Sequence, residues 1–187
     1  MRKSALFLTA ALAWASTTLP SLYGHDAQSN EGTRAPAAGK LSKPDLNFAN
    51  ESARGGLLEV ELGKLAQEKA VDAEVKRFGQ TMVQDHGKAN QELQQWASQA
   101  GVTLPSGLTD KGMKLKEQLG KASGAEFDRR YVEAMVKDHD HDVPMFQRQG
   151  DKGDNPELRA WAKKTVPTLQ GHQQMAHELQ TKLQRGQ

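Results

Sequence analysis

The chain contains one stretch that fixes the type of fold, VKRFGQTMVQDHGKANQELQQWASQA, running from Val75 to Ala100. Its apolar residues recur in alternating steps of three and four, which is the period of one face of an α-helix. They are Val75, Phe78, Met82, Ala89, Leu93, Trp96 and Ala100. His86 occupies the step of this stripe that no apolar residue fills. The stretch therefore predicts a long amphipathic helix with a histidine on its buried face.

Part of this stretch occurs a second time. Arg77-Phe78-x-x-x-Met82-Val83-x-Asp85-His86 matches Arg130-Tyr131-x-x-x-Met135-Val136-x-Asp138-His139, 53 positions later. Five identities and one aromatic exchange in ten residues indicate duplication. The second copy places His139 in the gap of a stripe formed by Val132, Met135, Val136, Val143 and Phe146. A further stripe, formed by Leu158, Trp161, Ala162, Leu169, Ala176 and Leu179, has His172 in its centre. Three predicted helices thus each bury one central histidine.

The residues between the stripes indicate where each helix begins and ends, and the lengths of the connections predict the topology. Helices are expected at about 46–68, 72–100, 123–149 and 154–183, with a short helical piece near 111–119. Asp72 and Asp154-Asn155-Pro156 supply helix starts, Gly101 a stop, and Ser123 with Glu126 a capping box. The first and last pairs of helices are joined by short turns and should be antiparallel hairpins. The connection at 102–123 is long enough to cross the bundle and make helices 72–100 and 123–149 parallel.

These features predict an all-α protein with a ferritin-like four-helix bundle, in which the long crossover contains a short extra helix. The domain is expected at 44–187, preceded by a disordered linker at 25–43 that is rich in small and polar residues. Residues 1–24 combine Arg2 and Lys3 with a short apolar run, which is typical of a secretory signal peptide. A periplasmic or secreted location, in association with the envelope or free, is expected.

Composition narrows the functional class. The formal charge of +2 comes from 25 basic and 23 acidic residues, and loss of Arg2 and Lys3 would leave a neutral mature chain. A nucleic-acid-binding protein would show a basic excess, so that class is excluded. No stretch in the mature chain has the roughly 20 apolar residues of a membrane span. The sequence indicates no protein partner, and a homo-oligomer is compatible with it. With no cysteine, stability depends on packing or a bound ion.

The buried histidines predict a metal site. Neutral imidazoles from different helices suit a divalent transition metal, and a carboxylate from helix 46–68 would complete the set. Glu61 lies between the apolar positions of that helix and Glu59 at their margin, so either can serve. Asp85 and Asp138, beside two of the histidines, are expected to orient the rings rather than bind the ion. The alternative is a set of satisfied core histidines.

Two observations limit this interpretation. A di-iron site needs Glu-x-x-His pairs, and none occurs, because Val83, Val136 and Leu169 stand three residues before the histidines. Counting from the expected helix ends also places His172 about 9 Å out of level with His139, at 1.5 Å per residue. A single compact site is therefore not assured by the sequence.

Several motifs together resemble an exported bacterial family called domain of unknown function 4142, whose members are often labelled outer membrane proteins. The similar segments are Gly56-Leu-Leu-Glu59-Val-Glu61-Leu-Gly-Lys-Leu-Ala66, Met82-Val-x-Asp-His86-x-x-Ala-Asn90-x-Glu-Leu93, Phe127-Asp128-x-x-Tyr131, Asp138-His139, Leu158-x-x-Trp-Ala162 and Pro167-x-Leu-x-x-His172. The resemblance implies a ferritin-like bundle and places Glu59, His86, His139 and His172 on the family pattern. It implies no established activity.

Two functions remain open at this point. The first is an exported bundle that binds a divalent transition metal through His86, His139, His172 and Glu59 or Glu61. The second is a non-catalytic structural or interaction module of the cell envelope, in which the same residues form a buried hydrogen-bond network. An enzyme is less favoured, because no nucleophile, phosphate-binding loop or acid pair stands out.

Overall fold

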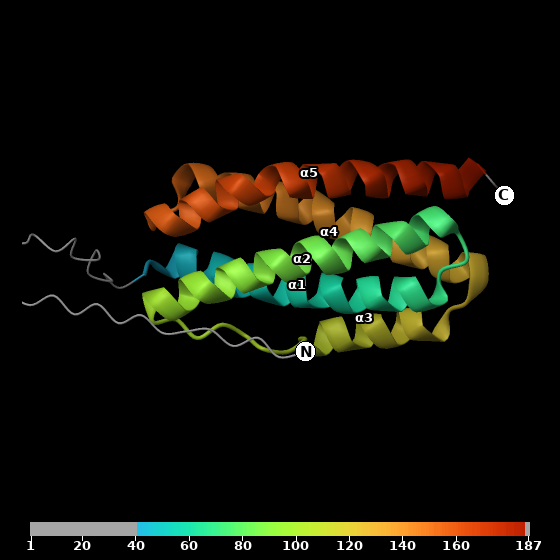
Figure 1. The fold of residues 1–187 in the computed structure, drawn as a ribbon, viewed down its shortest axis with the longest axis horizontal. Helices are drawn as coiled ribbons and strands as arrows, with labels where there is room; N and C mark the ends of the chain where they lie inside the picture. The colour runs from blue at the N-terminus through green and yellow to red at the C-terminus, as the bar shows by residue number, and fades with distance from the viewer. Residues whose placement is uncertain (1–40, 186–187) are drawn as a thin grey trace, which may run out of the picture. The chain divides into compact units, whose positions relative to one another are not determined.

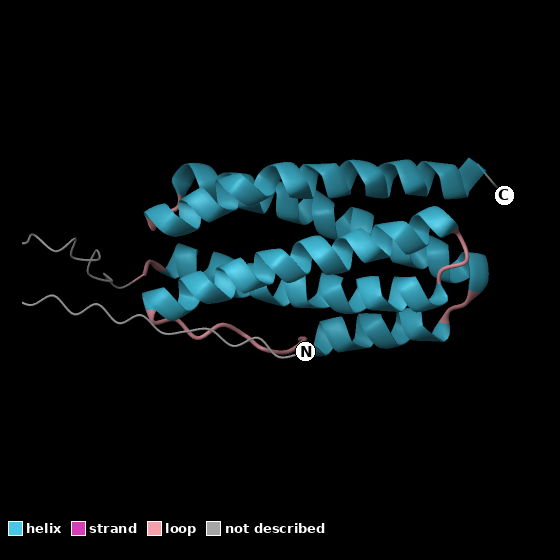
Figure 2. Cartoon of the chain, viewed as in Figure 1, coloured by secondary structure: helices cyan, strands magenta, loops and turns pink. Residues whose placement is uncertain are grey.

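The computed structural model describes residues 41–185, which form five helices (Figure 1). They are α1 Lys43–Lys69, α2 Ala73–Ala100, α3 Asp110–Lys121, α4 Gly124–Lys152 and α5 Pro156–Arg185. The expected all-α class is confirmed, and Figure 2 shows only helices and loops in the described part of the chain, with one long loop between α2 and α3. The predicted signal peptide at 1–24 and most of the predicted linker lie outside the described residues. None of the described helices is long and apolar enough to cross a membrane.

The four long helices form two antiparallel hairpins, as the turns predicted. α1 and α2 are joined through Ala70–Asp72, and the Asp72 carboxylate accepts hydrogen bonds from the Glu74 and Val75 amides at the start of α2. Gly101 ends α2 in the left-handed conformation, with φ of 68°, which favours glycine. The chain then returns along the bundle through α3, so that α2 and α4 are parallel (Figure 1). The predicted crossover with a short extra helix is therefore confirmed.

The start of α4 differs from the expected capping box. The Ser123 side chain makes no capping hydrogen bond, and Glu126 pairs with Arg130 at 2.7 Å. The physical reason is the left-handed Gly124, with φ of 58°, which turns the backbone at the position where a capping box needs helical geometry. α4 also continues to Lys152, three residues beyond the expected end.

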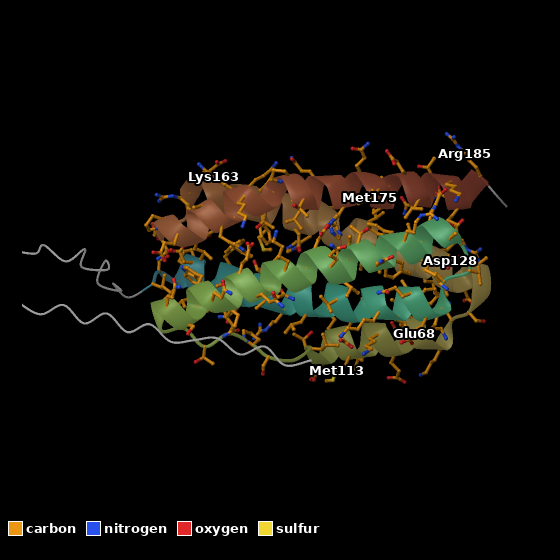
Figure 3. All side chains as sticks on the ribbon, viewed as in Figure 1. Glu68, Met113, Asp128, Lys163, Met175 and Arg185 are labelled. Carbon is orange, nitrogen blue, oxygen red and sulfur yellow. The ribbon has the colours of Figure 1, made fainter. Side chains whose placement is uncertain are left out.

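Two buried aspartates join the hairpins to each other. Asp128 of α4 accepts hydrogen bonds from the Val71 and Asp72 amides in the α1–α2 turn, at 3.1 and 2.8 Å. Figure 3 shows Asp128 at the end of the bundle where that turn lies. Asp45 of α1 makes the equivalent contact with the other hairpin: it accepts hydrogen bonds from the backbone amides of the α4–α5 turn and from the Gln149 side chain. Each hairpin therefore holds the turn of the other.

The apolar core consists of two clusters with a gap between them. One contains Leu62, Met82, Val136 and Ala176, and the other contains residues such as Leu93, Val143 and Leu169. The buried residues of the two clusters leave out the segments 54–61, 83–92, 137–142 and 170–175 of α1, α2, α4 and α5, from which only the partly buried Leu58 and Met175 pack against the first cluster. The middle of the bundle is thus a polar layer, and it contains the glutamates and histidines singled out from the sequence.

Close packing of α1 on α2 gives a first prediction. A Cβ atom at Gly79 would lie 2.7 Å from the Ala66 Cβ and 2.9 Å from the Gly63 carbonyl oxygen. Gly79→Ala should therefore lower the free energy of unfolding by about 1–3 kcal/mol, because the helices must separate. Gly87 in the same helix has no atom within 4 Å of such a Cβ, so Gly87→Ala should stabilise by up to about 1 kcal/mol. Urea unfolding of both variants measures this, and changes of the same sign would contradict it.

Candidate metal centre

Four helices bring one side chain each into the polar layer. α1 contributes Glu59, α2 His86, α4 His139 and α5 His172, and none of these residues is more than 5% exposed. The three imidazole rings lie with their centroids 5.6, 5.1 and 5.4 Å apart. Each histidine is in the centre of an apolar stripe, so burial of the stripe carries the ring inward. The three rings form one compact cluster.

The offset of about 9 Å expected between His172 and His139 is too large. Because α4 ends at Lys152, His139 lies 13 residues before the end of its helix, and His172 lies 16 residues after Pro156. The remaining difference of about 4.5 Å along the bundle is closed by the side chains. Side chains lean toward the N-terminus of their own helix, and α4 and α5 are antiparallel, so the two imidazoles lean toward each other.

Each imidazole has one nitrogen engaged by a neighbour. His139 Nδ1 donates to the Met135 carbonyl oxygen at 2.9 Å, which fixes Nε2 as the nitrogen with the free lone pair. His172 Nε2 lies 2.9 Å from an Asp85 carboxylate oxygen. His86 Nδ1 lies 2.7 Å from Glu59 Oε2. Carboxylates and carbonyl groups bound to one ring nitrogen are the usual means of orienting a metal-binding histidine.

The opposite nitrogens are buried and have no hydrogen-bond partner among the described residues. They are Nε2 of His86, Nε2 of His139 and Nδ1 of His172. One ring nitrogen from each histidine lies within 4.8 Å of the others. Metal-bound nitrogens at 2.0–2.1 Å from a tetrahedral ion would be about 3.3 Å apart, so small ring rotations suffice to close the site. The donor set and its geometry therefore fit a transition-metal ion.

The protonation of the histidines is also suited to metal binding. Burial lowers the pKa of His86 and His172 to about 4, in each case against the opposing effect of nearby carboxylates. Burial and the neighbouring rings lower the pKa of His139 to about 3. All three imidazoles are consequently neutral at pH 7, and a neutral imidazole is the form that binds a metal.

A carboxyl pair adjoins the histidines. Glu59 is fully buried, with Oε1 3.5 Å from His139 Nε2, and ligand atoms of Glu59, Asp138 and His139 lie within 4.8 Å of one another. Burial and the negative charge of Asp142 raise the pKa of Glu59 well above its usual range. Burial, followed by the charge of Glu59, does the same for the pKa of Asp138. Two negative charges buried this close repel each other, so the pair favours the uptake of a proton or a cation.

The structure does not bring every predicted residue to the cluster. Glu61 is 30% exposed and binds Lys64 and Lys116, because it lies two positions from Glu59 on the other side of α1. Asp85 contacts His172 of α5 rather than its neighbour His86. Asp138 lies against Glu59, while the backbone of α4 orients His139.

Sequence reasoning missed Asp142, which is only 7% exposed and acts on Glu59 through its charge. Its signal was present, because it lies one helical turn after Asp138 and so shares a face with it. The surface histidines lie apart from the three buried rings. His177 contacts Asp140 at 2.9 Å, and His141 contacts Asp142 at 3.0 Å.

The family described as Domain of unknown function (DUF4142) matches residues 30–179. No curated protein matches the chain. A DUF305 fragment from Deinococcus radiodurans has a similar structure, with a TM-score of 0.67 and 12% identity over 76% of this chain and 98% of that one. A DUF305 protein from Streptomyces coelicolor gives a TM-score of 0.64 and 16% identity over 75% and 92%. CopM in its Cu(I)-bound form gives 0.61 and 18% over 72% and 93%. At these identities the similarity shows the fold alone.

Proposed function

The chain belongs to the family described as Domain of unknown function (DUF4142), and we propose that it binds one transition-metal ion between His86, His139 and His172. Glu59 lies beside the ion and balances its charge. The proposal agrees with the resemblance found from the sequence motifs, which identified the family correctly and left its activity open.

The proposal is supported by the cluster of rings: one nitrogen of each buried imidazole lies within 4.8 Å of the others, and each ring has one nitrogen held by a neighbour and one without a hydrogen-bond partner among the described residues. A buried polar atom without a partner costs about 1–3 kcal/mol, so three of them in one layer require a compensating interaction. A metal ion supplies it for all three at once. Imidazole ligands suit zinc, copper, nickel and iron, so they define the class of ion rather than its identity.

Copper is a reasonable member of this class to test first. CopM, whose fold is similar, is described in Cu(I)-bound and Cu(II)-bound forms. For divalent ions, copper also binds nitrogen sites more tightly than zinc. We propose storage, sensing or protection against excess metal as the role. The signal-peptide pattern at 1–24 further supports a role outside the cytoplasm.

The alternative, a structural module with a buried hydrogen-bond network, is weaker on this geometry. Such a network stabilises a fold when its members are satisfied, and here several oxygen and nitrogen atoms of the layer are not. The two hypotheses differ in a measurable way. Under the alternative, His86→Gln lowers stability whether or not metal is present, and metal ions leave the unfolding temperature of the unaltered chain unchanged.

Metal analysis tests the proposal. The metal-free chain is incubated in turn with Cu²⁺, with Cu⁺ under reducing conditions and with Zn²⁺, dialysed, and analysed by mass spectrometry for bound metal. We expect one ion per chain for at least one of the three. At a free concentration 100 times the dissociation constant, binding should stabilise the fold by about 2.7 kcal/mol. A chain with all three histidines replaced by alanine should bind none. Equal uptake by that variant, or no uptake by either chain, would refute the proposal.

A further inference from the structure

A line of acidic groups leads from the surface to the proposed site along the seam between α1 and α4. On α1, Glu51, Gly55 and Glu59 are spaced by four residues and share a face. On α4, Asp142 and Asp138 are also four residues apart. Because the two helices are antiparallel, the α1 positions meet the α4 positions in the reverse order (Figure 1). The acids therefore occupy successive levels between solvent and the polar layer.

The outer levels are joined by short contacts. Glu51 and His141 are 55% and 57% exposed, and Glu51 Oε1 lies 3.5 Å from His141 Nε2. His141 Nδ1 in turn lies 3.0 Å from Asp142 Oδ1. Asp142 is almost completely buried, and its second oxygen faces Gly55, where a Cβ atom would lie 3.7 Å away. This is the distance of an ordinary van der Waals contact, so the Asp142 carboxylate packs directly against α1.

The inner level adjoins the candidate metal centre. Asp138 and Glu59 each offer an oxygen within 4.8 Å of His139. Oε1 of the fully buried Glu59 and Oδ2 of Asp138 have no hydrogen-bond partner among the described residues, while Glu59 Oε2 lies 2.7 Å from His86 Nδ1. Acidic groups alone are common on protein surfaces, but buried carboxylate oxygens without partners favour a cation. Asp85, on the other side of the cluster, is hydrogen-bonded to His172 and is therefore engaged in holding a ring.

We propose that Glu51, Asp142 and Asp138 form the access route by which the metal ion passes between solvent and the three histidines. This inference rests on the proposed function. A hydrated cation must lose its water before it reaches a buried site, and carboxylates at successive depths replace that water a few ligands at a time. Negative charge along a path also raises the local concentration of cations and the rate at which they bind.

The kinetics of metal transfer test the route. Stopped-flow mixing of the metal-free full chain with Zn²⁺ bound to a chromophoric indicator gives the uptake rate, and mixing of the loaded chain with EDTA gives the release rate. In Asp142→Asn, which keeps nearly the same shape, we expect both rates to fall about fivefold or more, with one ion still bound at equilibrium. Glu51→Gln should slow uptake less, because an exposed charge is screened by salt. Glu51→Gln also leaves the core undisturbed, because the Glu51 side chain is 55% exposed.

Asp140→Asn is the matched control. It makes the same chemical change two residues away, on the side of α4 that faces Gln173 and His177 of α5. Its uptake rate should stay within about twofold of that of the unaltered chain. Equal slowing in Asp140→Asn and Asp142→Asn would overturn the route in favour of general attraction by negative charge. Faster release from Asp142→Asn would overturn it too, since Asp142 would then stabilise only the bound ion. Absence of Zn²⁺ and copper binding by the unaltered chain would refute the proposed function itself.

Discussion

Replacement of His139 by alanine is expected to weaken metal binding by about 100-fold or more, or about 2.7 kcal/mol. His139 is fully buried and faces both the other rings and Glu59. Loss of a group that only orients a ligand typically costs 10–100-fold in affinity, so loss of a ligand should cost at least as much. Competition with an indicator of known affinity, for Zn²⁺ and Cu²⁺ separately, measures the change.

Two controls make this prediction specific. His177→Ala removes an imidazole of the same kind from the surface, where the ring is 48% exposed and contacts Asp140. It should leave the affinity unchanged within about twofold. The affinity of Asp85→Ala should fall between those of the two variants, because this change only releases the His172 ring from its hydrogen bond. Circular dichroism must first show that His139→Ala is folded. If the folded variant binds metal as tightly as the unaltered chain, His139 is no ligand.

The second large effect is expected at Asp45, in the first turn of α1 and away from the candidate metal centre. Asp45 is 1% exposed and accepts hydrogen bonds from Gln149 Nε2 at 2.6 Å, the Asp154 amide at 3.3 Å and the Asn155 amide at 2.8 Å. Asp45→Ala would leave these donors without an acceptor. Since a hydrogen bond to a charged group contributes about 1.5–3 kcal/mol, we expect a loss of about 3–5 kcal/mol in the free energy of unfolding.

Thermal and urea unfolding measure this loss. For a chain of this length, about 3 kcal/mol corresponds to a fall of roughly 10 °C in the unfolding temperature. Asp45→Asn keeps one oxygen acceptor and should lose less than the alanine variant. Asp151→Ala, at an exposed position near the end of α4, should change stability by no more than about 0.5 kcal/mol. If Asp45→Ala proves as stable as Asp151→Ala, Asp45 does not join the hairpins as described.

Much of the bundle could be predicted from local sequence. Four long helices, two tight turns and a crossover followed from the spacing of apolar residues and from Asp72, Gly101 and the Asn155-Pro156 pair. The errors were at helix ends. Ser123 does not form its capping box because Gly124 is left-handed, and α4 runs three residues further than expected. Helix ends depend on a few torsion angles, which short motifs determine only weakly.

The candidate site was predicted in part. His86, His139 and His172 were found because each interrupts an apolar stripe, and the structure brings their rings together. The repeated Asp-His pairs suggested equivalent roles for Asp85 and Asp138, yet they face different helices. The sequence did not show which of Glu59 and Glu61 is buried, because both lie near the margin of the apolar stripe and a small rotation of α1 decides between them.

The sequence by itself determined the stripe of α2, α4 and α5 that carries each buried histidine, because such a stripe follows from the 3.6-residue period and needs no partner. Only the tertiary structure decided which of those residues meet. The encounter of His139 with His172 depends on the antiparallel packing of α4 and α5, in which their side chains lean toward each other. The partners of Asp45, Asp85 and Asp128 lie on other helices or turns and are distant in sequence, and the charge of Asp142 acts on Glu59 of α1. Such contacts depend on the rotation and level of each helix in the bundle, which are set by the packing of all the helices together.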